Sequence, residues 1–188
     1  MKLIMIRHGM TEANEKHLYC GSTDIPLSVP GAEALKERKS SVSYPDAEGY
    51  RVVTSGMKRC DETLSVLYGD MPHEVDPDLR EMDFGVFEMR SYDEMKDDPV
   101  YIDWISGDNE ANIAPGGESG NIMTERVIRA VRRLIDDGRD ALVVTHGGVI
   151  AAVMSYLFPE ERKNRYEWQP KPGGGYLIDP GARNYVKF

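Results

Sequence analysis

Three short apolar runs along the chain have the length and the residue types of buried β-strands. They cover residues 3–6, 52–54 and 141–145, and most of their side chains are aliphatic. Continuous apolar runs of this kind are typical of strands that are covered on both faces, as in parallel sheets. The pattern therefore predicts three strands of one buried sheet.

Segments in which apolar residues recur at helical spacing follow the second and the third of these runs. We expect helices over residues 58–67 and 149–157, and a longer helix from about residue 119 to residue 137. Ser119 is the expected N-cap of the long helix, and Gly138 is its expected stop. Apolar residues that share one face of this helix are expected to be buried: Ile122, Met123, Val127, Val131, Leu134 and Ile135.

The alternation of strands and helices indicates the fold class. It predicts an α/β fold, specifically a three-layer α/β/α sandwich with a mostly parallel central sheet. The whole chain, residues 1–188, is expected to form a single domain. Two short segments near the C-terminus, 176–178 and 185–186, are candidates for edge strands.

Composition and charge exclude several classes of function. The chain of 188 residues is 40% hydrophobic and has a formal net charge of −9, and it lacks the basic clusters with interleaved aromatic residues that nucleic-acid binding requires. No apolar run approaches the roughly 18 residues of a membrane span, and the first apolar run is too short for a secretory signal. Cys20 and Cys60 form neither a disulfide framework nor a zinc motif. We therefore expect a cytoplasmic protein without a metal, a nucleic-acid partner or a membrane partner.

Polar motifs follow each of the three predicted strands. Arg7, His8 and Gly9 follow the first strand, residues 55–59 follow the second, and residues 146–148 follow the third. Sheets of this class bind their ligands beyond the carboxyl ends of the strands. The three motifs, which lie far apart in the sequence, are therefore expected to converge at one edge of the sheet.

The residues of these motifs suit the transfer of a phosphoryl group. A phosphoryl group in transfer spreads negative charge over three oxygens, so its site needs fixed cationic donors and a nucleophile in line. Arg7, Arg59 and His146 are the candidate donors, and a neutral imidazole nitrogen of His8 is the candidate nucleophile, which would form a phosphohistidine. Short polar side chains within one turn of His8 are candidate ligand contacts: Thr11 and Asn14.

Five motifs occur in a defined order along the chain. They cover RHGMTEAN at residues 7–14, the loop 18–28, TSGMKR at residues 54–59 with Thr63, LREMDFG at residues 79–85, and VTHGG at residues 144–148. Together they resemble the signature motifs of the histidine phosphatase superfamily, in its phosphoglycerate mutase-like branch. The resemblance spans nearly the whole chain and implies a phosphoglycerate mutase-like fold.

The resemblance assigns roles to individual residues. It implies that His8 is the nucleophile, that Glu81 is the proton donor to the leaving group, and that His146 is an electrostatic partner, with Arg7 and Arg59 as phosphate clamps. Glu81 must carry a proton when the first step begins, which requires burial or nearby carboxylates. Further substrate contacts are implied at positions within the motifs: Thr11, Asn14, Gly21, Ser22 and Gly147.

The implied activity is that of a histidine acid phosphatase-type enzyme that hydrolyses a small phosphate monoester without a metal or a cofactor. The length favours a phosphatase, because mutases of this branch usually run to about 230 residues or more. Two alternatives stay open, namely phosphoryl transfer of the phosphoglycerate mutase type and a non-catalytic module that recognises phosphate. A metal-dependent reaction with Asp76 as nucleophile fits poorly, because the preceding residues 71–75 make a poor buried strand.

The choice of substrate is expected to depend on the segment 86–112, and the sequence predicts neither the substrate nor the oligomeric state. Helical pieces at residues 93–98 and 101–104 are expected to cap the pocket. Two positions depart from the family pattern: Met89 stands where glycine is common, and Glu62 stands where glutamine is frequent. Both departures concern the shape of the substrate mouth rather than the chemistry.

Overall fold

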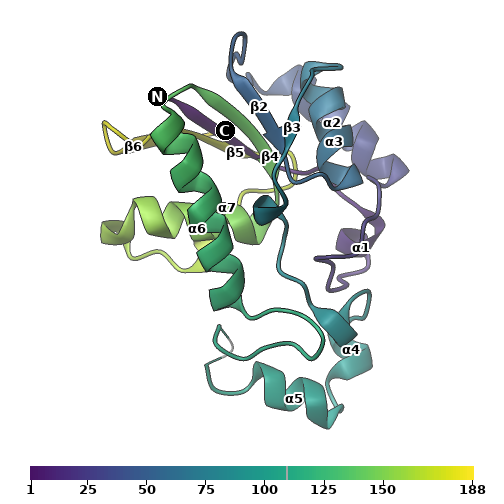
Figure 1. The fold of residues 1–188 in the computed structure, drawn as a ribbon. Coiled ribbons are helices and arrows are strands. Elements are labelled where there is room, and N and C mark those ends of the chain that lie inside the picture. Colours follow the sequence, from purple (N-terminus) through teal and green to yellow (C-terminus); the bar gives the residue numbers. More distant parts are fainter. Residues whose placement is uncertain (109) are drawn as a thin grey trace.

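A six-stranded sheet forms the centre of the computed structural model, which describes residues 1–108 and 110–188 (Figure 1). The strands lie in the order β3-β2-β4-β1-β5-β6. The four strands from β3 to β1 are parallel, and β5 and β6 are antiparallel to their neighbours, which confirms the mostly parallel sheet. Their bounds are β1 Leu3–Arg7, β2 Arg51–Thr54, β3 Glu74–Val75, β4 Ala141–Thr145, β5 Gly175–Asp179 and β6 Asn184–Lys187.

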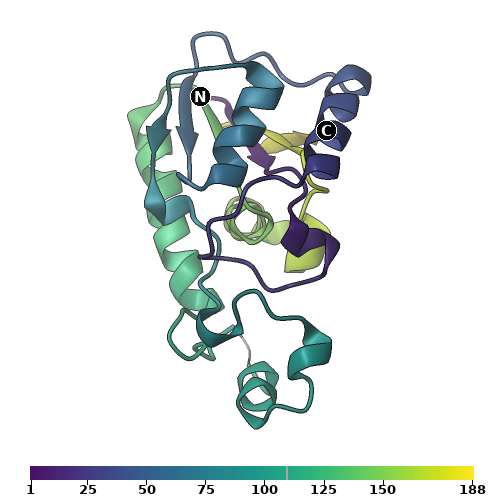
Figure 2. The ribbon, with the colours of Figure 1, turned by 90° about the vertical axis from the view of Figure 1, so that its right-hand side faces the viewer.

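Helices cover both faces of this sheet, which confirms the three-layer arrangement. Helices α2 and α3 lie on one face, and α6 and α7 lie on the other (Figures 1 and 2). Within the described residues, no helix is both long enough and apolar enough to cross a membrane. The helices are α1 Glu12–Glu15, α2 Val29–Ser41, α3 Lys58–Tyr68, α4 Tyr92–Met95, α5 Pro99–Ile105, α6 Gly120–Asp137, α7 Gly147–Leu157 and α8 Arg165–Trp168.

The first strand shows how one short segment supplies both halves of the core. Successive side chains of a strand point to opposite faces of the sheet. Leu3 and Met5 accordingly pack in the cluster that contains the apolar residues of α6 and α7, while Ile4 and Ile6 pack with those of α2 and α3. All four side chains are fully buried. The continuous apolar run at residues 3–6 therefore predicts a central strand correctly.

Several details differ from the predictions. The segment 176–178 belongs to β5, which lies between β1 and β6, so only the segment 185–186 forms an edge strand. Ile122 is 42% exposed, because at 3.6 residues per turn it points well away from the face of α6 that holds Met123 and Val127, so the prediction that it is buried is wrong. Helix α2 is missing from the predictions, since Leu35 is its only large buried apolar side chain and gives no helical period. Ser119 caps α6 and Gly138 ends it, as expected.

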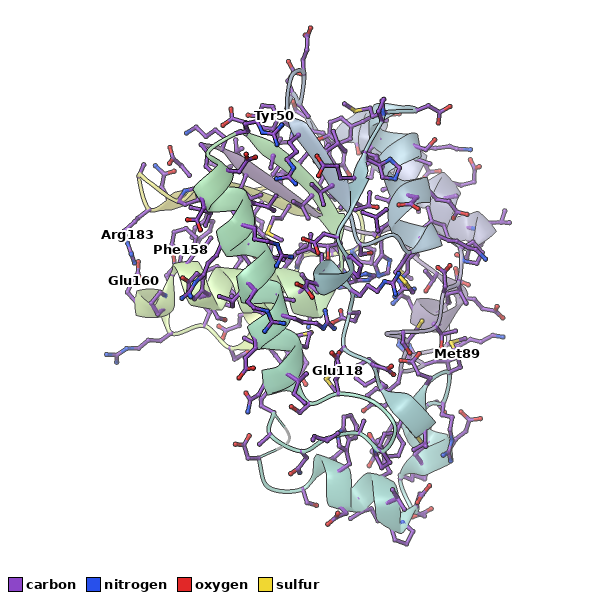
Figure 3. The ribbon with its side chains drawn as sticks, in the orientation of Figure 1. Tyr50, Met89, Glu118, Phe158, Glu160 and Arg183 are labelled. Carbon is purple, nitrogen blue, oxygen red and sulfur yellow. The ribbon has the colours of Figure 1, made fainter. Side chains whose placement is uncertain are left out.

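The C-terminal end of the chain is tied to the turn after α7. Figure 3 shows the side chains of Glu160 and Arg183 pointing toward each other, and their carboxylate and guanidinium groups lie 2.8 Å apart. Both side chains are more than half exposed, so the pair contributes little to stability. Phe158, which Figure 3 also labels, packs beneath this turn against Tyr185 with ring centroids 4.8 Å apart. The buried aromatic contact holds β6 in place more firmly than the ion pair does.

A lobe that contains α4 and α5 lies at the end of the molecule opposite the N-terminus (Figure 1). The helical pieces expected at residues 93–98 and 101–104 are present as α4 and α5, with shifted bounds. Aromatic rings hold the lobe together, and Phe87 and Trp104 have ring centroids 5.0 Å apart. The segment that the sequence links to substrate choice therefore has a packed interior of its own.

The backbone conformation at Met89 explains why glycine is common at this position of the family pattern. Its φ angle is +59°, in the left-handed region that favours glycine over other residues. We expect the substitution Met89→Gly to stabilise the fold by about 1 kcal/mol, because a non-glycine residue in this region costs roughly 1–2 kcal/mol. Thermal unfolding should show a melting temperature higher by about 2–4 °C. A lower melting temperature would show that the contacts of the Met89 side chain outweigh the backbone strain.

Candidate active site

The three polar motifs converge at the carboxyl ends of three adjacent strands, as predicted. His8 follows β1, His146 follows β4, and Arg59 lies in the first turn of α3, directly after β2. The ring centroids of His8 and His146 are 5.2 Å apart, with an angle of 66° between the ring planes. The side chains of His8, Arg59 and His146 are all at least 94% buried, since their exposed fractions are 6%, 1% and 0%. The site therefore concentrates cationic and imidazole groups in a protein with a net negative charge.

The backbone of the next residue sets the proton position on His8. The Nδ1 atom of His8 lies 2.7 Å from the carbonyl oxygen of Gly9. A carbonyl oxygen only accepts hydrogen bonds, so Nδ1 carries the proton and donates it. Burial, and after it the positive charge of Arg59, lower the pKa of His8 to about 3. The imidazole is therefore neutral near pH 7, and its Nε2 atom keeps a free lone pair, as a nucleophile requires.

His146 presents an unsatisfied polar atom inside the site. Its Nε2 atom lies 3.0 Å from the hydroxyl oxygen of Ser55, whereas its Nδ1 atom is buried without a hydrogen-bond partner among the described residues. Burial, followed by the charge of Arg59, lowers the pKa of His146 well below its usual value. A buried polar atom without a partner is costly, and an arriving ligand that satisfies it recovers that free energy.

Arg7 offers a second buried donor. Its Nη1 atom donates to the carbonyl oxygen of Pro170 at 2.9 Å, and its Nε atom is buried without a partner in the described part of the chain. Gly147 lies directly against the guanidinium, since a Cβ atom built there would be 3.2 Å from Cζ of Arg7. The sequence predicts Gly147 as a substrate contact, and the structure places it where it makes room for Arg7. Nε of Arg7 is thus an unpartnered donor, and Nδ1 of His146 becomes a second one in the tautomer that carries its proton there. Two such donors suit an anion with several acceptor oxygens.

The Arg59 guanidinium is buried and held by backbone carbonyl groups. Its Nη1 atom donates to the carbonyl oxygen of Thr23 at 2.9 Å, and its Nη2 atom donates to that of Gly21 at 2.7 Å. Its charge acts on the nearby imidazoles, because it lowers the pKa of both His8 and His146. The loop at residues 21–23 therefore decides how Arg59 is placed.

Glu88 holds this loop and is a residue that the sequence argument did not single out. Its carboxylate accepts the backbone N–H groups of Gly21 and Ser22 at 2.9 and 3.0 Å and the hydroxyl group of Thr23 at 2.6 Å. The prediction places Gly21 and Ser22 in contact with substrate, but here their N–H groups bind Glu88. The signal that could have identified Glu88 is its position in the stretch Phe84–Glu88, which belongs to the family pattern.

The carboxylate of Glu81 lies at the N-terminus of α7. One oxygen accepts the N–H group of Gly148 at 2.9 Å, and the other accepts the N–H group of Met82 at 3.1 Å. A Cβ atom built on Gly148 would lie 2.4 Å from Oε1 of Glu81, so a larger residue there would force this carboxylate to move. A role of Glu81 as proton donor requires burial or nearby carboxylates, and the structure shows a half-buried side chain held by backbone donors.

Arg126 fixes the backbone that carries Glu81. Its guanidinium donates to the carbonyl oxygens of Asp78, Arg80 and Glu81 at 2.9, 2.6 and 2.9 Å. It also forms an ion pair at 2.7 Å with Glu118, which lies near the start of α6 (Figure 3). Three hydrogen bonds from this side chain therefore hold the segment that presents the candidate acid, and two more bind Glu118.

Thr11 and Asn14 form the N-terminal cap of α1. The hydroxyl group of Thr11 accepts the backbone N–H of Asn14 at 3.3 Å, and Oδ1 of Asn14 accepts the backbone N–H of Thr11 at 3.0 Å. This reciprocal pair is a capping box. The structure therefore gives both residues a local structural role, and only the amide nitrogen of Asn14 is left to reach a ligand.

A cavity of about 270 Å³ opens next to Glu81. Aromatic and aliphatic side chains form much of its wall, together with Gly148 and the polar residues Arg165 and Gln169. Helix α5 contributes to this wall, which agrees with the prediction that the segment around it caps the pocket. In the described part of the chain, no three His, Cys, Asp or Glu side chains gather as they do around a metal ion. The apolar side chains of the wall are Leu18, Tyr19, Met82, Phe84, Trp104, Ile105 and Tyr166.

The two buried imidazoles, His8 and His146, are expected to make the free energy of unfolding depend on pH. His8 and His146 stay neutral in the folded protein below pH 6.5, because their pKa values are lowered, whereas in the unfolded chain they take up protons near pH 6.5. Stability is therefore fully present above pH 6.5 and falls with pH below it, by roughly 1 kcal/mol per histidine per pH unit. Urea unfolding at pH 7 and pH 5.5 should show this loss, and the variant His8→Asn should lose less stability over the same range. An equal loss in the variant would contradict the assignment.

Known proteins resemble this chain in both sequence and structure. The sequence profile of the histidine phosphatase superfamily (branch 1) matches residues 3–184. The adenosylcobalamin/α-ribazole phosphatase of Salmonella typhimurium is 31% identical over 185 residues, which cover 95% of this chain and 90% of that protein.

Two solved structures share its fold. The α-ribazole phosphatase of Shigella flexneri is 29% identical with a TM-score of 0.82, and the superposition covers 100% of this chain and 95% of that one. A phosphoglycerate mutase of Thermus thermophilus is 28% identical with a TM-score of 0.74, and the superposition covers 100% of this chain and 98% of that one. The phosphoglycerate mutase-like fold that the sequence motifs imply is therefore confirmed.

Proposed function

The chain belongs to the histidine phosphatase superfamily, branch 1, and from this premise we propose that it hydrolyses a small phosphate monoester through a phosphohistidine on His8. One observation carries the proposal. His8 is held as the neutral Nδ1–H tautomer, and it lies beside two buried nitrogen atoms that have no partner in the described residues, Nε of Arg7 and Nδ1 of His146. A nucleophile next to unsatisfied donors is the arrangement that phosphoryl transfer requires.

In the first step, Nε2 of His8 attacks the phosphorus atom, and the bond from phosphorus to the ester oxygen breaks. Arg7, Arg59 and His146 stabilise the negative charge on the three remaining oxygens. Glu81 gives its proton to the ester oxygen, so the leaving group departs as a neutral alcohol.

In the second step, water attacks the phosphorus atom of phospho-His8, and the bond from phosphorus to nitrogen breaks. Glu81, now a carboxylate, accepts a proton from the attacking water. Inorganic phosphate leaves, and both residues return to their starting states. Hydrogen bonds from the backbone N–H groups of Gly148 and Met82 hold the Glu81 carboxylate in position.

An assay with an aryl phosphate in the presence of a chelator tests this proposal. We expect release of inorganic phosphate at an unchanged rate, because every group in the two steps belongs to the chain itself. Complete loss of activity with the chelator would contradict the proposal. Interconversion of phosphoglycerates with little phosphate release would identify a mutase, and phosphate binding without turnover would identify a recognition module.

The cavity beside Glu81 supports a substrate whose leaving group carries a ring. The leaving oxygen must lie within reach of the Glu81 carboxyl group, so the rest of the leaving group extends into the adjacent space of about 270 Å³. Tyr19, Phe84 and Trp104 line this space and pack edge to face on one another, and such an aromatic wall favours a ligand with a ring. α-Ribazole phosphate, after which several relatives are named, is the first candidate for such a substrate.

Tyr166 offers a direct test of this pocket. Its side chain is 77% exposed and lines the cavity, so its removal should leave the core intact. We expect Tyr166→Ala to raise KM for α-ribazole phosphate by about 3- to 10-fold, the equivalent of one lost ring contact, while KM for glycerol phosphate stays the same. Tyr156→Ala, which removes a 39% exposed tyrosine that is not part of this cavity, is the matched control. Equal effects on both substrates would argue against a ring subsite.

A further inference from the structure

Two buried side chains behind His146 have no place in the two chemical steps. Ser55 follows β2, and Cys60 lies in the first turns of α3. The Ser55 hydroxyl oxygen lies 3.0 Å from Nε2 of His146 and 3.2 Å from Sγ of Cys60, and Sγ of Cys60 lies 3.7 Å from the same Nε2 atom. All three side chains are fully buried, so water does not compete for these contacts.

The number of protons that His146, Ser55 and Cys60 can donate limits the directions of the hydrogen bonds among them. A phosphate dianion offers only acceptor oxygens, so Nδ1 of His146 must carry a proton to bind it. In the neutral imidazole Nε2 is then an acceptor, and the Ser55 hydroxyl is the donor closest to it. That hydroxyl has a single proton. Once the proton is given to Nε2, the 3.2 Å contact between Ser55 and Cys60, in which the hydroxyl otherwise donates to Sγ, needs the thiol as its donor.

Cys60 keeps the proton that this arrangement needs. Burial raises the pKa of the Cys60 thiol to about 12, so the sulfur stays protonated over the whole physiological range. A buried thiol of this kind is a poor nucleophile and a poor target for oxidation, but it remains a weak hydrogen-bond donor. Its contacts with Ser55 and His146 distinguish it from an apolar core residue.

We propose that Ser55 and Cys60 are positioning residues that hold His146 as the Nδ1–H tautomer through the chain Cys60 S–H to Ser55 O–H to His146 Nε2. The unpartnered Nδ1–H group is thereby aimed at the phosphoryl oxygens before substrate arrives. The inference rests on the proposed function for the identity of the anion, whereas the tautomer itself is a property of the free protein. Removing either positioning residue lets the proton of His146 move to Nε2, where it cannot reach the phosphate.

Nitrogen NMR of the free protein, labelled with ¹⁵N in its histidines, tests the tautomer without any turnover. At neutral pH we expect a protonated Nδ1 and an unprotonated Nε2 for His146 in the wild-type protein. We expect Ser55→Ala and Cys60→Ala to shift the population toward the Nε2–H tautomer, and Cys60→Ser, which keeps a donor, to resemble the wild type. An Nε2–H tautomer in the wild-type protein, or no change in either alanine variant, would overturn the proposal.

Kinetics with an aryl phosphate give a second readout. We expect kcat to fall by about tenfold or more in Ser55→Ala, as for other residues that orient a catalytic imidazole, and by about threefold in Cys60→Ala. KM should change little, and Cys60→Ser should restore kcat. Equal losses in Cys60→Ala and Cys60→Ser would indicate a packing defect and contradict the role of the thiol proton. If the tautomer responds as expected but no phospho-His8 forms, the proposed function fails while the tautomer assignment stands.

Discussion

Replacement of His8 by alanine is expected to lower kcat for phosphate monoesters by at least about 10⁴-fold. Without Nε2 of His8 there is no group to form the phosphorus–nitrogen bond, and only binding and charge stabilisation by Arg7, Arg59 and His146 remain. Loss of a nucleophile in an otherwise intact site costs about 10⁴- to 10⁶-fold in comparable enzymes. Because His8 is 94% buried, with an exposed fraction of 6%, circular dichroism should accompany the assay to show that the variant is folded.

Two controls make the result specific to His8. His73→Ala removes an imidazole that the structure places at the surface, away from the polar motifs, and should leave kcat unchanged. Rapid acid-free quenching of the wild-type enzyme with labelled substrate should trap a phosphorylated protein whose label maps to residue 8. Undiminished turnover by His8→Ala would exclude the phosphohistidine route.

The strands and the convergence of the motifs were predictable because they depend on local pattern and on a general rule. Continuous apolar runs identify β1 and β4, and the rule that ligands bind at the carboxyl ends of parallel strands brings His8 and His146 together. Helix α2 was not predictable in this way, since it rests on the sheet with few large side chains. Element β3 has only two residues, and both are exposed, so no apolar run marks it.

The parts of the site that sequence reasoning missed are contacts between segments that lie far apart in the chain. Glu88 binds the loop at residues 21–23 across more than 60 positions, and Ser55 meets His146 across 91 positions. Both residues lie in stretches that belong to the family pattern, but the pattern does not say which partners they meet, so their contacts emerge only when the fold brings the partners together. The role of Gly148 is equally hidden in the sequence, because its missing Cβ atom matters only where the fold brings Glu81 against it.

The charge distribution explains how a protein with a net negative charge can bind an anionic substrate. The chain carries a formal net charge of −9, which repels phosphate at long range. Arg59 is almost fully buried, with an exposed fraction of 1%, so its charge is screened little by solvent and acts mainly inside the site. Binding therefore depends on a few fixed cations at short range, and the loss of one of them should be severe.

Replacement of Arg59 by methionine is expected to lower kcat/KM by about 10³-fold, within the range seen when a cation that stabilises a transferring phosphoryl group is lost. Methionine keeps much of the volume of the arginine stem, so the main change is the loss of charge and of the hydrogen bonds to Gly21 and Thr23. Loss of this charge should also raise the pKa values of His8 and His146, since Arg59 lowers both.

Arg59→Lys separates the two roles of the side chain, because it keeps the charge but loses the planar fork that binds both carbonyl oxygens. We expect it to recover part of the affinity for inorganic phosphate, measured by calorimetry, and little of kcat, since the ammonium group cannot hold the loop of residues 21–23 in place. Arg129→Met, on the exposed side of α6, is the matched control and should bind phosphate normally. Normal kcat/KM in Arg59→Met would mean that Arg59 only supports the loop, and Arg7 and His146 would then have to carry the phosphoryl charge alone.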